Sequence, residues 1–361
     1  MEKIKVGVIG CGGIANGKHL PSIKTIPEVE IVAFCDIIPE RAQEAAKKYG
    51  TADAKVYTDY KELLKDESLV AVHVCTPNRS HSFITVDALH AGKNVICEKP
   101  MAINSAEAKK MVDAAKETGK VLTIGYQNRY RNDSLYMKRV CENGDLGEIY
   151  YGKALALRRR AVPTWGVFLN EYEQGGGPLI DIGTHALDLT LWMMDNYKPK
   201  MVVGTKFQKF REQRETGNAW GDWDPKEFTV EDSAFGFIVM EDGALVSLDS
   251  SWAINMLDAV EAQPVLCGTK AGIDMKDGVR INGVRYGKQY IERPDLSAGG
   301  VAFFEGAGGG KPEEIEQRIF YDAVIKGKEV CVKPEQAYVV TQILEAIYES
   351  AKTGKPVYLN D

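Results

Sequence analysis

The chain has 361 residues, of which 44% are hydrophobic and 27% are charged, and its formal net charge at pH 7 is -6. This composition is typical of a folded, water-soluble protein, and the negative charge gives no electrostatic reason to expect nucleic acid or an anionic membrane as a partner. The length exceeds what one hydrophobic core usually supports, so we expect two domains.

The seven cysteines show no paired spacing, and four of them, Cys11, Cys35, Cys75 and Cys97, lie at or just past predicted strand ends. We therefore expect reduced packing residues rather than disulfides or metal ligands. The start of the chain has no signal-peptide apolar region, and no apolar stretch approaches membrane-spanning length. These features favour a cytoplasmic location.

The first third of the chain alternates short apolar runs with amphipathic segments. The runs predict strands at Ile4–Ile9, Glu30–Cys35, Val56–Tyr57, Val70–Cys75, Asn94–Cys97 and Val121–Ile124. Nearly continuous apolar runs are typical of a parallel sheet that is covered on both faces. Helix signals lie between them: Pro39 and Gly50 bracket one helix, and Asn104 with Glu107 resembles a capping box. Residues 1–125 are therefore predicted to form a doubly wound α/β domain.

After residue 125 the pattern changes, and residues 126–361 are predicted to form a second, α+β domain. Helices are expected at 131–143, 180–196, 312–325 and 334–352, with a long strand at 148–160. Three dipeptides typical of hairpin turns, Asp242-Gly243, Asp277-Gly278 and Asn282-Gly283, indicate a mostly antiparallel sheet with helices packed on one face. The polar segment 211–226 is expected to be a surface excursion.

A glycine-rich turn follows the first predicted strand. The segment from Gly10 to Ala15 has the pattern Gly-x-Gly-x-x-Ala, in which the first glycine permits a tight turn and the second lets a pyrophosphate approach the backbone. The following helix offers unpaired N–H groups to phosphates. The residues expected to bind a dinucleotide here are Gly10, Gly12, Gly13 and Ile14, although a simple strand-to-helix turn has the same pattern.

Asp36 ends the second predicted strand, near the spacing expected of an acid that binds the adenosine ribose. A carboxylate there repels a 2′-phosphate, and Ile37 follows it, so NAD(H) is favoured over NADP(H). Arg41 lies close enough to keep NADP(H) open. A helix-capping role for Asp36 is compatible with cofactor binding.

Two further motifs end strands at the same edge of the predicted sheet. Thr76-Pro77-Asn78-x-x-His81 follows the fourth strand and is expected to line the cofactor, although a Pro-Asn turn with a structural histidine explains it equally well. Glu98-Lys99-Pro100 follows the fifth strand. Glu98 and Lys99 are expected to lie beside the cofactor, because ligands bind past the carboxyl ends of such strands. A lysine that points into that crevice is a candidate for acid–base or electrostatic catalysis. Without the neighbouring motifs, the same lysine would be explained as a solvent-exposed residue at a strand end.

A second glycine-rich segment, 175–177, precedes the apolar helix at 180–196. Asp181 and His185 are four residues apart and share one helical face, which Asp188 approaches. Burying such polar groups on a helix costs free energy, so we expect them either to pair with each other or to serve a function. No second His or Cys stands at metal-ligand spacing, so we expect no metal ion.

Together, these motifs resemble, in their order and spacing, those of the Gfo/Idh/MocA oxidoreductases, which include glucose–fructose oxidoreductase and inositol dehydrogenase. The resemblance covers nearly the whole chain, including the Val230–Asp232 segment, which it implies is a strand. It implies a Rossmann domain followed by an α/β domain whose open sheet mediates contacts in a dimer, a tetramer or a larger homo-oligomer.

The resemblance also implies site residues. Lys99, Asp181 and His185 match the family's catalytic trio, and all three are expected to contact substrate. A histidine, with an ordinary pKa near ~6.5, suits exchange of the hydroxyl proton, and a lysine can stabilise alkoxide charge. Which of the two accepts the proton is left open. Gln127 is expected near the cofactor, and further expected substrate contacts are Tyr126, Arg129, Arg158, Arg160 and Trp165. Arg159 should face away, because strand residues alternate; a solvated arginine cluster is an equal alternative.

The sequence thus predicts an NAD(H)-dependent oxidoreductase that acts on a ring secondary hydroxyl, with C3 an attractive position, of a sugar, glycoside or cyclitol. Three alternatives stay open: an inositol 2-dehydrogenase, an NAD-dependent glycosidase that acts through transient C3 oxidation, and a non-catalytic NAD sensor.

Overall fold

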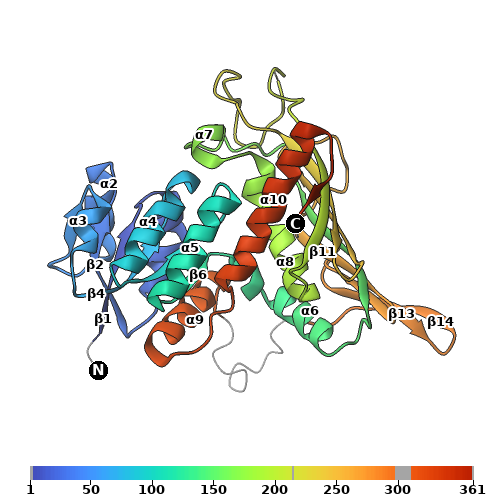
Figure 1. Cartoon of the computed structure of the whole chain (residues 1–361), viewed down its shortest axis with the longest axis horizontal. Helices are drawn as coiled ribbons and strands as arrows, with labels where there is room; N and C mark the ends of the chain where they lie inside the picture. The colour runs from blue at the N-terminus through green and yellow to red at the C-terminus, as the bar shows by residue number, and fades with distance from the viewer. Residues whose placement is uncertain (1–2, 214, 297–309, 360–361) are drawn as a thin grey trace. The chain divides into compact units, whose positions relative to one another are not determined.

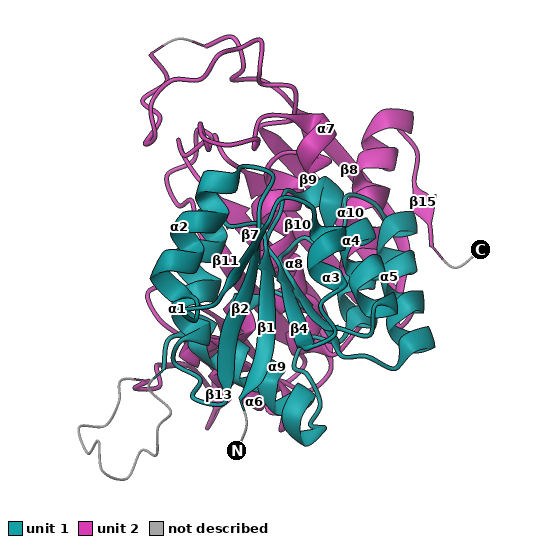
Figure 2. Ribbon diagram, turned by 90° about the vertical axis from the view of Figure 1, so that its left-hand side faces the viewer, with its two compact units in different colours: residues 1–127, 310–338 teal, residues 128–309, 339–361 magenta. Residues whose placement is uncertain are grey.

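The computed structural model describes residues 3–213, 215–296 and 310–359. The chain forms two compact units, which Figure 2 colours separately: unit 1 comprises residues 1–127 and 310–338, and unit 2 comprises residues 128–309 and 339–361. Residues 310–338 group with unit 1. The domain boundary at residue 125 stays a prediction.

Unit 1 contains a six-stranded parallel sheet in the order β3-β2-β1-β4-β5-β6. The order reverses at β1 and β4, which is where α/β sheets of this kind bind ligands. All six strands were predicted, each to within one residue, and they are β1 Ile4–Ile9, β2 Val29–Cys35, β3 Lys55–Tyr57, β4 Leu69–Val74, β5 Asn94–Cys97 and β6 Leu122–Ile124.

The helices of unit 1 begin and end largely where the sequence signals them. Pro39 starts α2, and the side chain of Asn104 accepts a hydrogen bond from the backbone of Glu107 at the start of α5. Gly119 ends α5 with a φ of 64°, a conformation that favours glycine. The helical elements are η1 Ala15–His19, α1 Leu20–Ile23, α2 Pro39–Tyr49, α3 Tyr60–Leu64, α4 Asn78–His90, α5 Ser105–Thr118 and α9 Pro312–Lys326.

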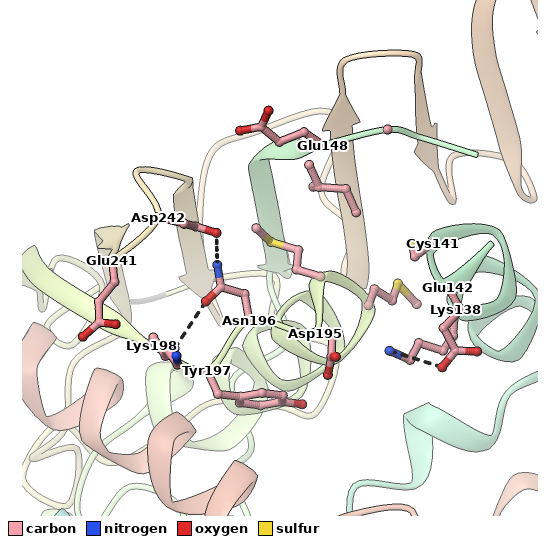
Figure 3. Close-up of a pocket in the computed structure, with 14 residues that line it drawn as sticks. Lys138, Cys141, Glu142, Glu148, Asp195, Asn196, Tyr197, Lys198, Glu241 and Asp242 are labelled. Atoms are coloured by element: carbon pink, nitrogen blue, oxygen red, sulfur yellow. Dashed lines mark hydrogen bonds and ion pairs between the residues drawn. The ribbon is translucent and has the colours of Figure 1, made fainter. Parts of the chain in front are cut away.

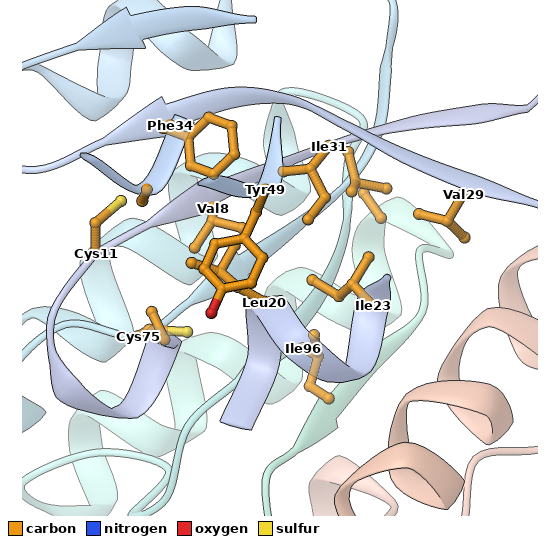
Figure 4. Packing of buried hydrophobic residues seen from close by; sticks show 14 of the residues in the cluster. Val8, Cys11, Leu20, Ile23, Val29, Ile31, Phe34, Tyr49, Cys75 and Ile96 are labelled. Atoms are coloured by element: carbon orange, nitrogen blue, oxygen red, sulfur yellow. The ribbon is translucent and has the colours of Figure 1, made fainter. Parts of the chain in front are cut away.

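A buried apolar cluster of unit 1 lies on one face of the sheet, where Val8, Ile31 and Phe34 pack against helix residues such as Leu20 (Figure 4). Phe320 and Tyr321 of α9 belong to the same buried cluster. Full burial of each such side chain is worth about 1.5–3 kcal/mol. This apolar contact holds a late segment of the chain on the first sheet.

Unit 2 contains a nine-stranded sheet in the order β14-β13-β12-β11-β7-β10-β9-β8-β15. As predicted, it is mostly antiparallel; β7 and β10 pair in parallel. Its elements are η2 Gln127–Tyr130, α6 Asn132–Glu142, β7 Ile149–Leu157, α7 Glu171–Gln174, η3 Leu179–Gly183, α8 Thr184–Met194, β8 Pro199–Phe207, β9 Ser233–Met240, β10 Leu245–Ser251, β11 Glu261–Gly268, β12 Ala271–Asp274, β13 Arg280–Arg285, β14 Lys288–Glu292, α10 Pro334–Thr353 and β15 Val357–Tyr358. The first residue of η2 and the first five of α10 belong to unit 1.

Two of the three predicted hairpin turns are confirmed. Asp242-Gly243 joins β9 to β10, and Asp277-Gly278 joins β12 to β13. The prediction for Asn282-Gly283 is wrong, because this dipeptide lies inside β13, where a Cβ atom at position 283 would lie 3.0 Å from the hydroxyl oxygen of Tyr290 and 3.1 Å from its ring. Cross-strand packing of that ring overrides the local turn preference, and the turn follows at Tyr286-Gly287, both with positive φ.

Helices α6, α8 and α10 lie on one side of this sheet (Figure 1). Helix α8 packs on β7 and β11, and Ile347 of α10 occupies the space left by Gly204 of β8 and Gly236 of β9. The segment 211–226 contains no helix or strand among its described residues, as predicted for an excursion. Val230–Asp232 precede β9 instead of forming a strand. Within the described ranges, no helix is both long and apolar enough to cross a membrane.

Candidate functional site

The glycine-rich turn after β1 is open where a cofactor is expected. Gly10 has a φ of +89°, and a Cβ atom there would lie 2.6 Å from the carbonyl oxygen of Cys75, so only glycine fits. Apart from the adjoining backbone, no atom of the described residues lies within 4 Å of the Cβ positions of Gly12 and Gly13, and the neighbouring side chain of Ile14 is partly exposed. The loop thus combines a tight turn with free space above the backbone.

Asp36 lies at the end of β2 and is 8% exposed. Its Oδ2 accepts a hydrogen bond from the backbone N–H of Cys11 at 2.8 Å, and its Oδ1 accepts one from Ile38 at 2.9 Å. These bonds tie the carboxylate to the glycine turn and leave further lone pairs for ribose hydroxyls. Ile37 is exposed, as is Arg41 in the first turn of α2. The loop and the acid therefore fit a dinucleotide.

Thr76, Pro77 and Asn78 lie where β4 gives way to α4, beside the glycine turn. His81 is buried in α4, with its Nδ1 2.8 Å from the carbonyl oxygen of Pro100 and its Nε2 2.8 Å from that of Thr76. The ring therefore holds two loops of the site together, and both of its nitrogens are committed to the backbone. Of the two interpretations of His81, this geometry favours the structural one over a direct cofactor contact.

Lys99 lies past the end of β5 and is partly exposed, whereas Glu98 beside it is buried. Oε1 of Glu98 accepts hydrogen bonds from Nζ of Lys18 at 2.7 Å and from Nε2 of His19 at 2.8 Å, and Oε2 accepts one from the backbone N–H of Lys99 at 3.2 Å. Although burial favours the neutral acid, Lys18 and His19 hold the pKa of Glu98 well below its usual value. Glu98 is thus a buried anion that supports the backbone of Lys99.

Sequence reasoning missed the partners of Glu98. Lys18 and His19 follow the glycine turn as polar residues in a buried helix, which is a signal that could have found them. Lys18 also contacts Oε2 of Glu316 at 2.9 Å and donates to Oε1 of Gln127 at 3.3 Å. Glu316 belongs to α9, and nothing local in the sequence links it to Lys18. Gln127, expected near the cofactor, is thereby joined to this buried network.

In unit 2, Asp181 lies in η3 and His185 follows it in α8, with 7% of its surface exposed. Asp181 and His185 are four residues apart in this continuous helical stretch, and their shared helical face stays a prediction from that spacing. Oδ2 of Asp181 accepts a hydrogen bond from the indole N–H of Trp252 at 3.0 Å, and this tryptophan is fully buried. A rigid indole donor fixes the carboxylate. Trp252 follows β10, far from Asp181 in sequence, and no sequence signal marked it.

The glycine-rich segment before η3 is held by a second buried glutamate, Glu231. Its carboxylate accepts hydrogen bonds from the backbone of Gly177 at 3.0 Å and of Leu179 at 3.3 Å, and from the hydroxyl of Tyr348 at 2.8 Å. A Cβ at Gly177 would lie 2.2 Å from the Glu231 carbonyl oxygen, and one at Gly176 would lie 2.0 Å from the Tyr348 hydroxyl. Approach of the protein's own groups, rather than of a ligand, thus requires these glycines.

Arg129 and Asp188 form a buried ion pair in unit 2. The guanidinium donates to both carboxylate oxygens at 2.9 and 2.6 Å and to the hydroxyl of Tyr197 at 3.2 Å, and Arg129 is 0% exposed. Breaking such a pair strands a buried charge, so its role is structural. Tyr126 in unit 1 is also 0% exposed. The burial of Arg129 and Tyr126 argues against the substrate contacts expected of them.

The expected arginines lie at the end of β7. Arg158 forms a two-pronged ion pair with Glu261 at 2.5 and 2.7 Å and lies over the ring of Trp220. Although burial opposes it, the hydrogen bond to Glu261 and the charges of Glu261 and Asp181 raise the pKa of Arg158. Arg160 instead donates to the side chain of Asn255 and lies over Phe210, and Arg159 is exposed.

Trp165 is 50% exposed, and its ring meets that of Trp220 edge to face at 4.8 Å between centroids. The hydroxyl of Thr164 donates to the carbonyl of Trp220, and Asn218 bonds both backbone groups of Val162. The two loops that carry the tryptophans are therefore joined. The guanidinium of Arg158 lies over the ring of Trp220, so it packs against the same aromatic pair.

A shallow groove lies at the other end of α8, lined by residues that include Lys138, Glu148, Tyr197 and Asp242 (Figure 3). Asn196 donates to Asp242 at 2.9 Å, and Lys138 pairs with Glu142 at 3.4 Å. The groove lies about 15 Å along the helix from His185, at 1.5 Å per residue, and contains none of the expected site residues. Among the described residues, no cluster of three or more His, Cys, Asp or Glu side chains could hold a metal ion.

Two family models match the chain. One, described as "Oxidoreductase family, NAD-binding Rossmann fold" of the Gfo/Idh/MocA group, matches residues 4–126. The other, described as "Oxidoreductase family, C-terminal alpha/beta domain" of the same group, matches residues 138–359. Together they cover both units.

Individual relatives agree with these matches. The D-glucoside 3-dehydrogenase of Escherichia coli (strain K12) is 36% identical over 357 residues, which cover 99% of this chain and 97% of that protein. The inositol 2-dehydrogenase of Salmonella typhimurium is 32% identical over 197 residues, or 54% of this chain and 56% of that protein. The crystal structure of GenD2 from gentamicin A biosynthesis in complex with NAD superposes with a TM-score of 0.78 at 26% identity, covering 100% of this chain and 97% of that one.

Proposed function

As a member of the Gfo/Idh/MocA oxidoreductase family, the chain is an NAD-binding dehydrogenase of CH–OH groups, and we propose that it oxidises the C3 hydroxyl of a sugar or glycoside. The observation that carries this choice is the match to a D-glucoside 3-dehydrogenase over nearly the full length of both chains. Inositol 2-dehydrogenases match about half of the chain, so a cyclitol is the second candidate.

We propose that Lys99, Asp181 and His185 carry the chemistry, as the family motifs imply. His185 accepts the hydroxyl proton, since an imidazole exchanges protons near neutral pH. Lys99 stabilises the negative charge that develops on the same oxygen. Asp181 orients the substrate hydroxyl, and its bond from Trp252 keeps the carboxylate in place. Bound NAD supplies the hydride acceptor.

We infer that NAD(H) is preferred over NADP(H). The support is the carboxylate of Asp36 at the end of β2, held by the backbone of Cys11 beside the open glycine turn. A 2′-phosphate near this anion is repelled. Replacing Asp36 by Ala should weaken NAD binding and narrow the preference over NADP, measured by calorimetric titration of both; an unchanged ratio contradicts the assignment.

The decisive experiment is a screen of NADH formation across glycosides, free sugars and cyclitols, with the 3-keto product identified by mass spectrometry. Lys99→Met and His185→Asn, tested separately, should each lose about 10²–10⁴-fold in kcat, while NAD binding persists. Normal turnover in either variant contradicts its role. Release of nitrophenol from a nitrophenyl glycoside without net NADH would instead indicate the glycosidase alternative.

We also propose that the chain forms a homo-oligomer through the outer face of the unit 2 sheet. Large apolar side chains are exposed there, such as Phe237 at 56% and Phe207 at 39%. Apolar residues gathered on an open sheet mark an interaction surface. Light scattering of the native chain and of Phe237→Lys tests this: a monomer in both cases contradicts it.

A further inference from the structure

A chain of buried polar side chains runs beneath Glu98 in unit 1. We call it the Tyr321–Glu98 chain, and its members are Tyr321, His73, His19 and Glu98. The hydroxyl of Tyr321 lies 2.6 Å from Nε2 of His73, the Nδ1 atoms of His73 and His19 are 2.9 Å apart, and Nε2 of His19 lies 2.8 Å from Oε1 of Glu98. All four residues are at most 4% exposed. The contacts link β4, η1, α9 and the end of β5.

With both rings neutral, the hydrogen bonds of this chain run in one direction. An ionised carboxylate only accepts, so Nε2 of His19 carries the hydrogen. The amide nitrogen of Gln317, which only donates, lies 3.5 Å from Nδ1 of His19. Burial lowers the pKa of both histidines, which favours the neutral rings with one N–H each. Nδ1 of His19 is therefore an acceptor, His73 donates to it through Nδ1, and Nε2 of His73 accepts from Tyr321. The phenol hydrogen sets the tautomer of both rings, and through them the bond to Glu98.

Lys18 fixes the same carboxylate from another side. Its Nζ lies 2.7 Å from Oε1 of Glu98 and 2.9 Å from Oε2 of Glu316, and Lys18 is only 7% exposed. A buried ammonium between two carboxylates has few alternative positions. Two donors, the ammonium of Lys18 and the ring N–H of His19, thus hold Oε1 of Glu98. Oε2 is left to accept a hydrogen bond from the backbone N–H of Lys99.

Gly125 lies next to the carboxylate of Glu98 and the ammonium of Lys18. A Cβ atom at this position would lie 3.0 Å from Oε1 of Glu98 and 3.2 Å from Nζ of Lys18. A methyl group there would shift the carboxylate by a few tenths of an ångström without removing any polar group. Position 125 therefore offers a probe of the geometry alone.

We propose that the Tyr321–Glu98 chain, together with Lys18, positions Lys99 for catalysis by fixing the carboxylate that holds its backbone. These are positioning residues, since they act through Glu98 and not on the substrate. The inference rests on the proposed catalytic role of Lys99. It assigns a task to α9, because Tyr321 and Glu316 come from that helix.

The first test compares Gly125→Ala with Gly17→Ala. Gly17 adjoins Lys18, but its Cβ position has no atom within 4 Å, so it is a matched control. Gly125→Ala should lower kcat about tenfold, because small misplacements of catalytic groups are costly. KM for substrate and Kd for NAD should change less than about twofold. Hydrogen exchange at the Lys99 amide should speed up in this variant and not in the control.

A double-mutant cycle separates positioning of Lys99 from general damage. In a Lys99→Met background, with the residual rate measured at high enzyme concentration, Gly125→Ala should have less than about a twofold effect. An equal loss in both backgrounds, or unchanged amide exchange at Lys99, overturns the proposal. Turnover that survives Lys99→Met itself would instead overturn the catalytic role of Lys99.

The second test removes the phenol hydrogen that sets the direction of the chain. Tyr321→Phe should lower kcat about threefold or more, because one hydrogen bond that directs the chain is lost, and should change the pH profile of kcat. The matched control is Tyr49→Phe, which removes another largely buried phenol, 3.4 Å from the carbonyl oxygen of Asn16. Equal effects of the two variants on kcat and on the pH profile overturn the role of the chain.

Discussion

Glu98 in unit 1 and Glu231 in unit 2 both hold backbone next to a proposed catalytic residue, but by different means. Glu98 faces the ammonium of Lys18, which keeps the pKa of this carboxyl well below its usual value. Glu231 faces neutral donors, two backbone N–H groups and the hydroxyl of Tyr348, and burial raises its pKa. A charged anchor gives strong, directional bonds but depends on its counter-ion. The neutral anchor should tolerate the loss of any one donor.

The largest effect is expected from Lys18→Met, which leaves Glu98 and Glu316 buried without their shared cation. Removing one partner of a buried pair costs about 3–5 kcal/mol, so the free energy of unfolding in urea should fall by that amount. Lys109→Met is the control, because Lys109 is half exposed and pairs with Asp113 on the surface. A loss no larger than in the control would remove the distinction between the two anchors.

The second-largest effect is expected in the pH dependence of stability. It arises from Glu316, which shares the cation Lys18 with Glu98. Burial raises the pKa of Glu316 from 4.5 to about 7, opposed by Lys18 and assisted by the charges of Glu98 and Glu313. Between these values the folded chain binds a proton that the unfolded chain releases, so this contribution is full below pH 4.5 and is lost as the pH rises through 7. Its size is about 3 kcal/mol, at about 1.4 kcal/mol for each pKa unit.

Glu316→Gln should therefore flatten the fall in unfolding free energy between pH 5 and about pH 8. Urea unfolding of both proteins across this range measures it, with Glu117→Gln as the control, since the side chain of Glu117 is 74% exposed. Parallel curves for the native chain and Glu316→Gln would show that Glu316 does not titrate in this range.

The comparison also shows which parts of the site a sequence can predict. The strands of unit 1 and the turn at Gly10 follow from local patterns, because apolar runs, caps and a tight turn act over a few residues. Asp36, Lys99, Asp181 and His185 were predicted as site residues for a related reason: each stands at a strand end or on a helical face that periodicity reveals. The match to the family motifs adds roles to these positions.

The partners of these residues could not be predicted, because their contacts join distant segments. Glu316 and Tyr321 reach unit 1 from α9, and Trp252 reaches Asp181 across 71 positions of sequence. The wrong turn at Asn282-Gly283 has the same origin, since packing of Tyr290 decides the local backbone. Arg129 shows the converse. Its motif indicated a substrate contact, but in the folded chain its guanidinium forms a buried ion pair with Asp188.

A smaller effect is expected at the neutral anchor. Tyr348→Phe removes one of several donors to Glu231 and should cost about 0.5–1.5 kcal/mol of unfolding free energy. It should lower kcat less than Gly125→Ala does, because the bonds from Gly177 and Leu179 still hold the loop before Asp181. Chemical unfolding and steady-state kinetics measure both. A loss as large as that of Lys18→Met would show that Glu231 depends on Tyr348 as Glu98 depends on Lys18.

The smallest effect is expected at the aromatic pair formed by Trp165 and Trp220. If the half-exposed pair Trp165 and Trp220 contacts the aglycone of a glycoside, an aromatic aglycone gains about 0.5–1.5 kcal/mol from stacking. Trp165→Ala should then lower kcat/KM for phenyl glucoside about threefold to tenfold more than for methyl glucoside. Tyr286→Ala, which removes a fully exposed ring at the β13–β14 turn, is the control and should change neither. An equal loss for both glucosides would show that Trp165 does not distinguish between substrates. Asp181 and His185 would then remain as groups of unit 2 that are proposed to face the ligand.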